Sequence, residues 1–161
     1  MPSQNTNLTI IIVTYNSEAI IHNCLSNISP ENNEVFVVDN NSSDTTVKII
    51  ADNFKTVKII KNPTNLGFGR ANNIALSQTK NNFALILNVD AQISPDDIKK
   101  TIEIMSQNPD IAIAGGVVHN CVIENNKIIL LKILVLLSKN QQILILFSIF
   151  IQPSSIYNAF D

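Results

Sequence analysis

Short runs of consecutive apolar residues alternate along the chain with segments whose apolar residues recur at helical spacing. Five of these runs have strand length and are rich in β-branched or aromatic residues, a pattern typical of buried strands. The predicted strands are Leu8–Val13, Glu34–Val38, Val57–Ile60, Phe83–Leu87 and Ile111–Ala114.

Helical spacing predicts a helix in each of the four intervals between these runs. The apolar faces comprise Ile20, Ile21, Cys24, Leu25 and Ile28 in the first helix, Val47, Ile50, Ala51 and Phe54 in the second, Ala71, Ile74, Ala75 and Leu76 in the third, and Ile98, Ile102 and Met105 in the fourth. Ser17 is the predicted N-cap of the first helix. Ser94 followed by Pro95 predicts the start of the fourth helix, which ends at Asn108-Pro109.

A strand–helix unit repeated four times, followed by one more strand, predicts a mostly parallel α/β sheet with helices on both faces. We expect this domain to cover residues 8–118, after a polar tail at 1–7. Residues 119–161 form an apolar segment, in which two runs within 128–151 flank the letters SKNQQ. Each run is too short to span a bilayer. A helical hairpin, a peripheral membrane contact and a part of the core all remain open for this segment.

Composition is that of one folded domain, because 45% of the 161 residues are apolar and 15% are charged. A net charge of −2 and the absence of Trp do not fit a nucleic-acid-binding surface, so no nucleic-acid partner is expected. Cys24 and Cys121 lie far apart, and Cys24 is predicted to be a buried thiol. The first residues, MPSQNTN, lack the pattern of a signal peptide, and a cytoplasmic location is the default expectation.

Polar residues follow the first four predicted strands, at the point where each strand ends. The first strand is followed by Thr14-Tyr15-Asn16, the second by the letters DNNSSD from Asp39 to Asp44, the third by a loop with Gly67, Gly69 and Arg70, and the fourth by Asn88-Val89-Asp90. The carboxyl ends of parallel strands share one edge of the sheet, where ligands of α/β proteins bind. Two acids, an arginine and a glycine loop at that edge indicate a polar ligand.

Several kinds of site are excluded by the sequence. There is no P-loop, and GFGRAN lacks the third glycine of a dinucleotide-binding fingerprint. His22 and His119 are more simply read as structural or solvated residues, and no His/Cys cluster indicates zinc. What remains is a hard cation held by carboxylate oxygen beside a diphosphate, although Asp90 could also be a loop acid that faces water.

Four segments in this order and spacing resemble the family 2 glycosyltransferases, which have the GT-A fold. They are TIIIVTYNSEAIIHNCLSNI, EVFVVDNNSSDTT, NLGFGRANNIAL and LILNVDAQISPD, and the resemblance runs from residue 8 to about 118. The branch that these letters resemble best is the rhamnosyltransferase-like one. The resemblance implies a nucleotide-sugar donor, typically a UDP- or dTDP-sugar, and a glycan or lipid-linked acceptor.

The resemblance also implies roles for the residues that match the family's motifs. Thr14, Tyr15 and Asn16 would lie around the base and ribose, and Asp39 would accept a hydrogen bond from the ring N–H of the base. Asn65, Gly67 and Arg70 would lie near the nucleotide, with Arg70 offsetting phosphate charge. A turn-forming Asp39 and a solvated Arg70 are the competing interpretations. Asp44 is interpreted as a turn or capping acid.

Asn88-Val89-Asp90 matches the position of the family's D-x-D motif. The resemblance implies that Asp90 binds Mg²⁺ or Mn²⁺ bridging the diphosphate, with Asn88 contributing a carbonyl oxygen. Asn88 replaces the first acid of the motif, a position where that branch often has Asn. Val89 stands where the branch often has Pro.

A general base for the acceptor hydroxyl is not identified, because only Glu124 and Asp161 are acidic after Asp110. We therefore expect this chain to carry the donor-binding half of a glycosyltransferase, apparently truncated, in the cytoplasm or peripheral at the inner face of the membrane. A non-catalytic nucleotide-sugar-binding module is the alternative. A sugar nucleotidyltransferase fits less well, because TYNSE is not a glycine-rich basic loop.

Overall fold

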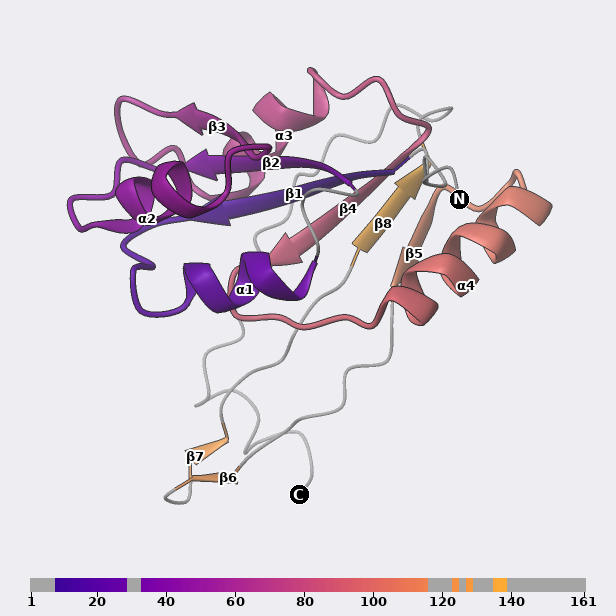
Figure 1. Cartoon of the computed structure of the whole chain (residues 1–161). Coiled ribbons are helices and arrows are strands. Elements are labelled where there is room, and N and C mark those ends of the chain that lie inside the picture. The colour runs from indigo at the N-terminus through magenta and orange to yellow at the C-terminus, as the bar shows by residue number, and fades with distance from the viewer. Residues whose placement is uncertain (1–7, 29–32, 116–122, 125–126, 129–134, 139–161) are drawn as a thin grey trace, which may run out of the picture.

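The computed structural model describes residues 8–28, 33–115, 123–124, 127–128 and 135–138. Most of these residues form a six-stranded sheet with helices on both faces (Figure 1). In the order in which they lie in the sheet, the strands are β3 (Lys58–Lys61), β2 (Glu34–Asp39), β1 (Leu8–Thr14), β4 (Phe83–Asn88), β8 (Val135–Ser138) and β5 (Ile113–Gly115). The predicted mostly parallel α/β sheet flanked by helices is confirmed.

The first four strands are parallel to one another, and β8 is antiparallel to both β4 and β5. The predicted fifth strand is therefore not a direct neighbour of β4, because β8 lies between them. Local periodicity could not show this, since β8 comes from a segment well beyond β5 in the chain. A separate antiparallel pair is formed by β6 (Ile123–Glu124) and β7 (Lys127–Ile128).

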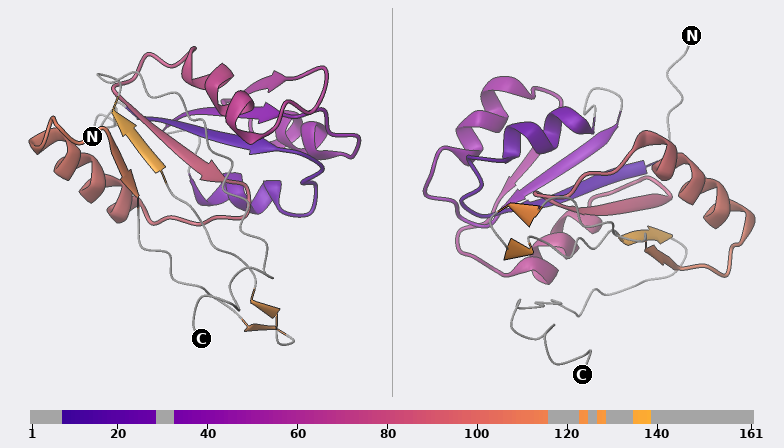
Figure 2. Two further views of the ribbon diagram at one scale, coloured as in Figure 1. Left: turned by 180° about the vertical axis from the view of Figure 1, so that it is seen from behind. Right: turned by 90° about the horizontal axis from the view of Figure 1, so that it is seen from below.

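Helices cover both faces of the sheet, as Figures 1 and 2 show. On one face α1 (Ile21–Asn27), α2 (Thr46–Asn53) and α4 (Pro95–Gln107) pack over the larger core cluster, which includes Ile10, Ile12 and Leu85. On the other face α3 (Phe68–Leu76) packs over β1 and β2 through Ala71 and Ala75. Strand residues that alternate between two covered faces must all be apolar, which explains the uninterrupted runs in the sequence.

Two details of the predicted helices are wrong. Helix α1 begins at Ile21, and the Ser17 carbonyl instead accepts hydrogen bonds from the N–H groups of Ile20 and Ile21, so that a separate turn precedes the helix. Ile20, placed on the apolar face by its spacing, is consequently 40% exposed. Ala51 is also exposed, because α2 is buried through Thr46 and Ile50 rather than through Val47 and Ala51.

The predicted start of the fourth helix is confirmed. The Ser94 hydroxyl accepts a hydrogen bond from the N–H of Asp97 at 3.1 Å, and Pro95 is the first residue of α4. The prediction of Cys24 as a buried residue is also confirmed, since its side chain lies in the larger core cluster.

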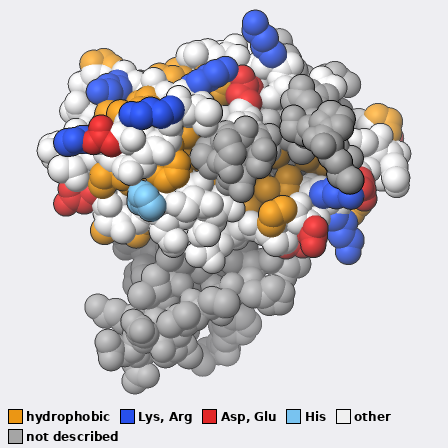
Figure 3. Space-filling view, in the orientation of Figure 1, with side chains coloured by type: hydrophobic (Ala, Val, Ile, Leu, Met, Phe, Trp, Pro, Cys, Tyr) orange, Lys and Arg blue, Asp and Glu red, His pale blue; other side chains and the backbone are white. Residues whose placement is uncertain are grey.

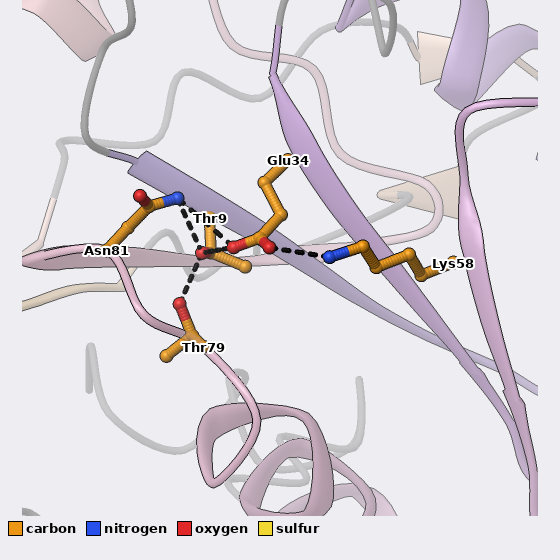
Figure 4. Close-up of polar contacts among 5 residues, drawn as sticks. All are labelled: Thr9, Glu34, Lys58, Thr79 and Asn81. Carbon is orange, nitrogen blue, oxygen red and sulfur yellow. Dashed lines mark hydrogen bonds and ion pairs between the residues drawn. The ribbon is translucent and has the colours of Figure 1, made fainter.

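A polar cluster closes the amino end of the sheet (Figure 4). The buried Thr9 hydroxyl of β1 donates to Glu34 of β2, accepts from the amide of Asn81 at 3.0 Å, and also contacts the Thr79 hydroxyl. Lys58 of β3 completes the cluster with an ion pair to Glu34 at 2.7 Å. These contacts attach the connection between α3 and β4 to the starts of three strands.

No helix among the described residues is long and apolar enough to cross a membrane. The polar tail at 1–7, His119, Cys121, Asp161 and most of the segment 128–151 lie outside the described residues. The membrane contact predicted for residues 128–151 stays a prediction. Four residues of that segment, Val135–Ser138, form β8 and belong to the sheet.

Candidate functional site

The strand order creates a topological switch point beside β1. From β1 the chain moves to β2 and β3 on one side of the sheet, and β4 returns to the other side of β1. A crevice between loops that diverge in this way is where ligands bind in open α/β sheets. The register places Thr14 opposite Asp39 and Val13 opposite Asn88, so three of the predicted site residues end adjacent strands at one edge.

Asp39 is held at the end of β2 with its carboxylate already oriented. The residue is only 3% exposed. Its Oδ1 accepts a hydrogen bond from the Thr14 hydroxyl at 3.3 Å, and its Oδ2 accepts one from the Ser42 N–H at 3.1 Å. A carboxylate has about four acceptor positions, so acceptor capacity remains for a further donor. Thr14 is therefore a support for Asp39, a role that the sequence did not predict.

Two buried asparagines that sequence reasoning missed link Asp39 to the loop before α3. The Asn40 side chain accepts a hydrogen bond from the amide of Asn62 at 2.8 Å and donates to the Gly67 carbonyl at 3.4 Å. The Asn62 N–H donates to the Asp39 carbonyl at 2.9 Å. Buried amides need such partners, but asparagine is so common in this chain that its letters carried no signal.

The three residues predicted near the nucleotide lie in the loop before α3 and in the first turn of that helix. Gly67 has a φ of +78°, which favours glycine, and a Cβ built there would meet nothing within 4 Å. Its conformation therefore accounts for the glycine. The Asn65 side chain accepts the Gly67 N–H at 2.9 Å, and Arg70 lies exposed in the first turn of α3. Asn65 thus shapes the loop, while Arg70 presents a cation at the surface.

The candidate metal ligand lies in a tight turn after β4. The Ala91 N–H donates to the Asn88 carbonyl at 2.9 Å, which closes a four-residue β-turn around Val89 and Asp90. Val89 and Ala91 pack against the core, whereas Asn88 and Asp90 are half-buried. Within the described part of the chain, neither the Asn88 amide nor the Asp90 carboxylate has a hydrogen-bond or ion-pair partner.

These residues fit a cation that a ligand helps to hold. No group of three or more His, Cys, Asp or Glu side chains that could hold a metal lies among the described residues. Mg²⁺ and similar ions often take one or two protein carboxylates and complete their shell with substrate phosphates and water. The Asp90 carboxylate with the Asn88 oxygen meets that requirement.

Tyr15 and Asn16 lie on the exposed loop after β1. Tyr15 is 52% exposed, and Asn16 has a φ of 48° and binds the loop after β2 through Ser42 and Ser43. Acidic and basic side chains lie interspersed on the face of the molecule that Figure 3 shows.

The pKa values of two acids in these loops, Glu18 and Asp44, are lowered from their ordinary values. Hydrogen bonds from the side chain and the N–H of Thr45 lower the pKa of Glu18, against weaker opposing effects of desolvation and of the Asp44 charge. Desolvation raises the pKa of Asp44, but hydrogen bonds from Thr46 and from the Glu18 N–H outweigh it and lower the pKa. Both acids are therefore charged at neutral pH.

Comparison with known proteins gives a consistent result. Residues 9–158 match the sequence model described as glycosyl transferase family 2. An uncharacterised glycosyltransferase of Haemophilus influenzae is 32% identical over 128 residues, which cover 75% of this chain and 50% of that protein. The chain thus spans about half the length of this relative.

Solved structures agree with the fold. Staphylococcus aureus TarS 1–349 in complex with UDP-GlcNAc has a TM-score of 0.56 and 29% identity, covering 63% of this chain and 32% of that one. The mannosyltransferase PcManGT of Pyrobaculum calidifontis, in complex with GDP-Man and Mn²⁺, has a TM-score of 0.66 at 20% identity and covers 83% of this chain and 45% of that one. At that identity the likeness to PcManGT supports the fold alone.

Proposed function

The chain belongs to glycosyl transferase family 2, and we propose that it binds a nucleotide-diphospho-sugar donor for transfer of the sugar to a glycan or lipid-linked acceptor. One observation carries this proposal: at the switch point the end of β2 places Asp39 opposite Thr14 of β1, and the end of β4 places Asn88 opposite the preceding Val13. Asp90 lies two residues beyond Asn88. Family membership supplies the chemistry, and the geometry supplies a polar site at the edge of the sheet where ligands bind.

The nucleoside half of the donor fits the β1–β2 side of this edge. Asp39 has acceptor capacity left for the ring N–H of a uracil or thymine base, and Tyr15 is exposed in the adjacent loop. The complex of TarS with UDP-GlcNAc supports a uridine donor, and a dTDP-sugar presents the same ring N–H. Within this proposal, Asn88 favours the rhamnosyltransferase-like branch, which often has Asn at the first position of the motif, whereas Val89 departs from it.

The diphosphate half fits the β1–β4 side. Asp90 and Asn88 would hold Mg²⁺ or Mn²⁺ against the diphosphate, and Arg70 would offset remaining phosphate charge. The bound cation would act as a Lewis acid that stabilises charge on the departing nucleoside diphosphate. The chain's own contribution is to orient the donor between Asp39 and Asp90, so that binding energy positions the anomeric carbon.

Calorimetry on the whole chain tests this proposal. We expect UDP with Mn²⁺ to bind, and Asp90→Ala to weaken that binding by about 100-fold, because charge-assisted ligation is lost. Asp96→Ala removes an exposed acid of α4 and is the matched control, which should bind as the parent chain does.

Absence of heat with UDP-sugars and dTDP-sugars in the parent chain, or an unchanged affinity in Asp90→Ala, would contradict the donor-site assignment. A transfer assay with lipid-linked and glycan acceptors separates the two classes of function. Binding without transfer favours a nucleotide-sugar-binding module.

A further inference from the structure

Two loops beside the proposed nucleoside site are joined by reciprocal hydrogen bonds, and contact with the donor does not explain these bonds. We call this set the loop clasp; it consists of Asn16, Ser17 and Glu18 after β1 and of Ser42–Thr46 after β2. Each loop contributes one acid, and each acid accepts a backbone N–H from the other loop. The Glu18 N–H donates to Asp44 at 3.1 Å, and the Thr45 N–H donates to Glu18 at 3.0 Å.

The two acids use their oxygen atoms differently. Glu18 uses one oxygen, Oε2, which accepts both the N–H and the hydroxyl of Thr45, the latter at 2.7 Å. Asp44 uses both oxygens, since Oδ1 accepts the Thr46 N–H at 3.0 Å while Oδ2 accepts the Glu18 N–H. In Glu18→Gln, the one remaining carbonyl oxygen can still accept both hydrogen bonds from Thr45. In Asp44→Asn, one of the two accepting oxygens becomes an NH₂ group, so one hydrogen bond must be lost.

A continuous path connects the loop clasp to Asp39. The Ser42 N–H donates to Asp39 at 3.1 Å, and the Ser42 hydroxyl accepts the Asn16 N–H at 2.9 Å. Asn16 in turn accepts the Ser43 N–H at 2.9 Å. Ser42 therefore contacts both the carboxylate proposed to recognise the base and the residue that follows the exposed Tyr15.

Backbone strain is concentrated at the same place. Among the described residues, the non-glycine residues with positive φ are Asn16 at 48° and Asn41 at 69°, one in each loop. Such conformations cost free energy and persist where surrounding contacts determine them. The hydrogen bonds of the loop clasp supply those contacts.

We propose that Glu18 and Asp44 are positioning residues that hold the two loops in the conformation that receives the nucleoside half of the donor. This proposal rests on the proposed function. Neither acid needs to touch the donor, because their effect is transmitted through Ser42 and Asn16 to Asp39 and Tyr15. Loss of the loop clasp lowers the fraction of molecules in the binding-competent conformation, and the apparent dissociation constant rises by the same factor.

The test is a set of four variants measured with two ligands, UDP with Mn²⁺ and UMP without metal. Glu18→Ala should raise both dissociation constants by the same factor, about tenfold. Glu18→Gln should restore both to within about twofold, and Asp44→Asn should resemble Glu18→Ala. Asp52→Asn, an exposed acid of α2 outside the loop clasp, is the matched control and should bind normally.

Affinities are compared under conditions in which circular dichroism shows every variant to be folded, so that a purely structural role would leave them unchanged. The positioning role would be overturned by normal affinity in Glu18→Ala. It would also be overturned if Glu18→Ala lost affinity for UDP with Mn²⁺ but not for UMP, or if Glu18→Gln lost as much affinity as Glu18→Ala. If the parent chain binds neither ligand, the proposed function is overturned instead. The parent chain is therefore measured before any variant is compared with it.

Discussion

The polar side chains at the two ends of the sheet are arranged in opposite ways. At the amino end, Thr9, Glu34 and Asn81 bind one another and Lys58 neutralises the acid, so the cluster is closed (Figure 4). At the carboxyl end, Asp90 and Arg70 have no hydrogen-bond or ion-pair partner in the part of the chain that the structure describes. A closed cluster stabilises the fold, whereas groups without internal partners are available to a ligand.

The carboxyl end of the sheet contains two sets of polar residues, a buried inner set and a more exposed outer set. Asp39, Asn40 and Asn62 are buried and bound to their neighbours, as the amino-end cluster is. They support the half-buried and exposed residues beyond them. The comparison therefore predicts that substitutions at the amino end change stability alone, while those in the outer set of the carboxyl end change ligand affinity alone.

The largest change in stability is expected at the centre of the amino-end cluster. Thr9→Val keeps the shape of a side chain that is fully buried but removes the hydroxyl shared by Glu34, Thr79 and Asn81. We expect the free energy of unfolding, measured by urea titration, to fall by about 2 kcal/mol, because three half-buried partners lose a hydrogen bond to a fully buried hydroxyl. The affinity for UDP should not change.

Thr101→Val is the control for this change, since the Thr101 hydroxyl donates only to the Asp97 carbonyl of its own helix. It should lower the free energy of unfolding by no more than about 0.5 kcal/mol. A Thr9→Val protein as stable as the parent chain would show that the closed cluster contributes nothing.

Arg70→Ala should show the opposite behaviour. Because Arg70 is exposed at the start of α3, its removal should change the free energy of unfolding by less than about 0.5 kcal/mol. The dissociation constant of UDP should rise about tenfold, which corresponds to about 1.4 kcal/mol of lost phosphate interaction. Lys99→Ala removes an exposed cation from α4 and should leave UDP binding intact. Equal effects of the two variants would mean that Arg70 is an ordinary solvated residue.

The smallest effect is a pH dependence at the amino end. Partial burial raises the pKa of Glu34, but hydrogen bonds from Lys58 and Thr9 and the charges of Lys58 and Lys80 outweigh it, so the pKa is lowered. A lowered folded-state pKa means that ionised Glu34 stabilises the protein above its unfolded-state pKa of about 4.3. This contribution is lost as the pH falls through the lower folded-state value.

We expect Glu34→Gln to remove about 0.5–1 kcal/mol of stability at neutral pH, because Lys58 is largely exposed and the ion pair is screened. The difference from the parent chain should shrink as urea titrations are repeated from about pH 6 down to about pH 3. Glu103→Gln, on the exposed side of α4, should show no such convergence. A stability difference that grows with acidity would mean that the folded-state pKa of Glu34 is raised rather than lowered.

Local patterns were sufficient for most of the fold and for the position of the candidate site. The β-branched runs identified β1 to β4 to within about one residue at each end, because doubly covered strands must be apolar throughout. Ser94 and Pro95 marked the start of α4 correctly, since capping depends on a few adjacent residues. The polar residues that follow each strand could also be identified from the sequence. Because strands alternate with helices, the strands were expected to be parallel and these residues to lie at one edge of the sheet.

Ser17 shows where local reasoning failed. Serine before an apolar helical pattern usually caps the helix, yet the Ser17 N–H donates to the Thr46 hydroxyl of another helix at 2.8 Å. The contact spans 29 positions, and no spacing rule within one segment can detect it. The reciprocal hydrogen bonds of Glu18 and Asp44 could not be predicted either, because they also join residues that are far apart in the sequence.

The amino-acid sequence by itself therefore determined the class of fold, the elements from β1 to α4 and the set of polar residues at the carboxyl edge. Only the tertiary structure decided the strand order, the insertion of β8 between β4 and β5, the closed cluster around Thr9 and the loop clasp. The physical reason is that periodicity and capping are properties of neighbouring residues. Strand partners and hydrogen bonds between loops depend on which distant segments the whole core brings together.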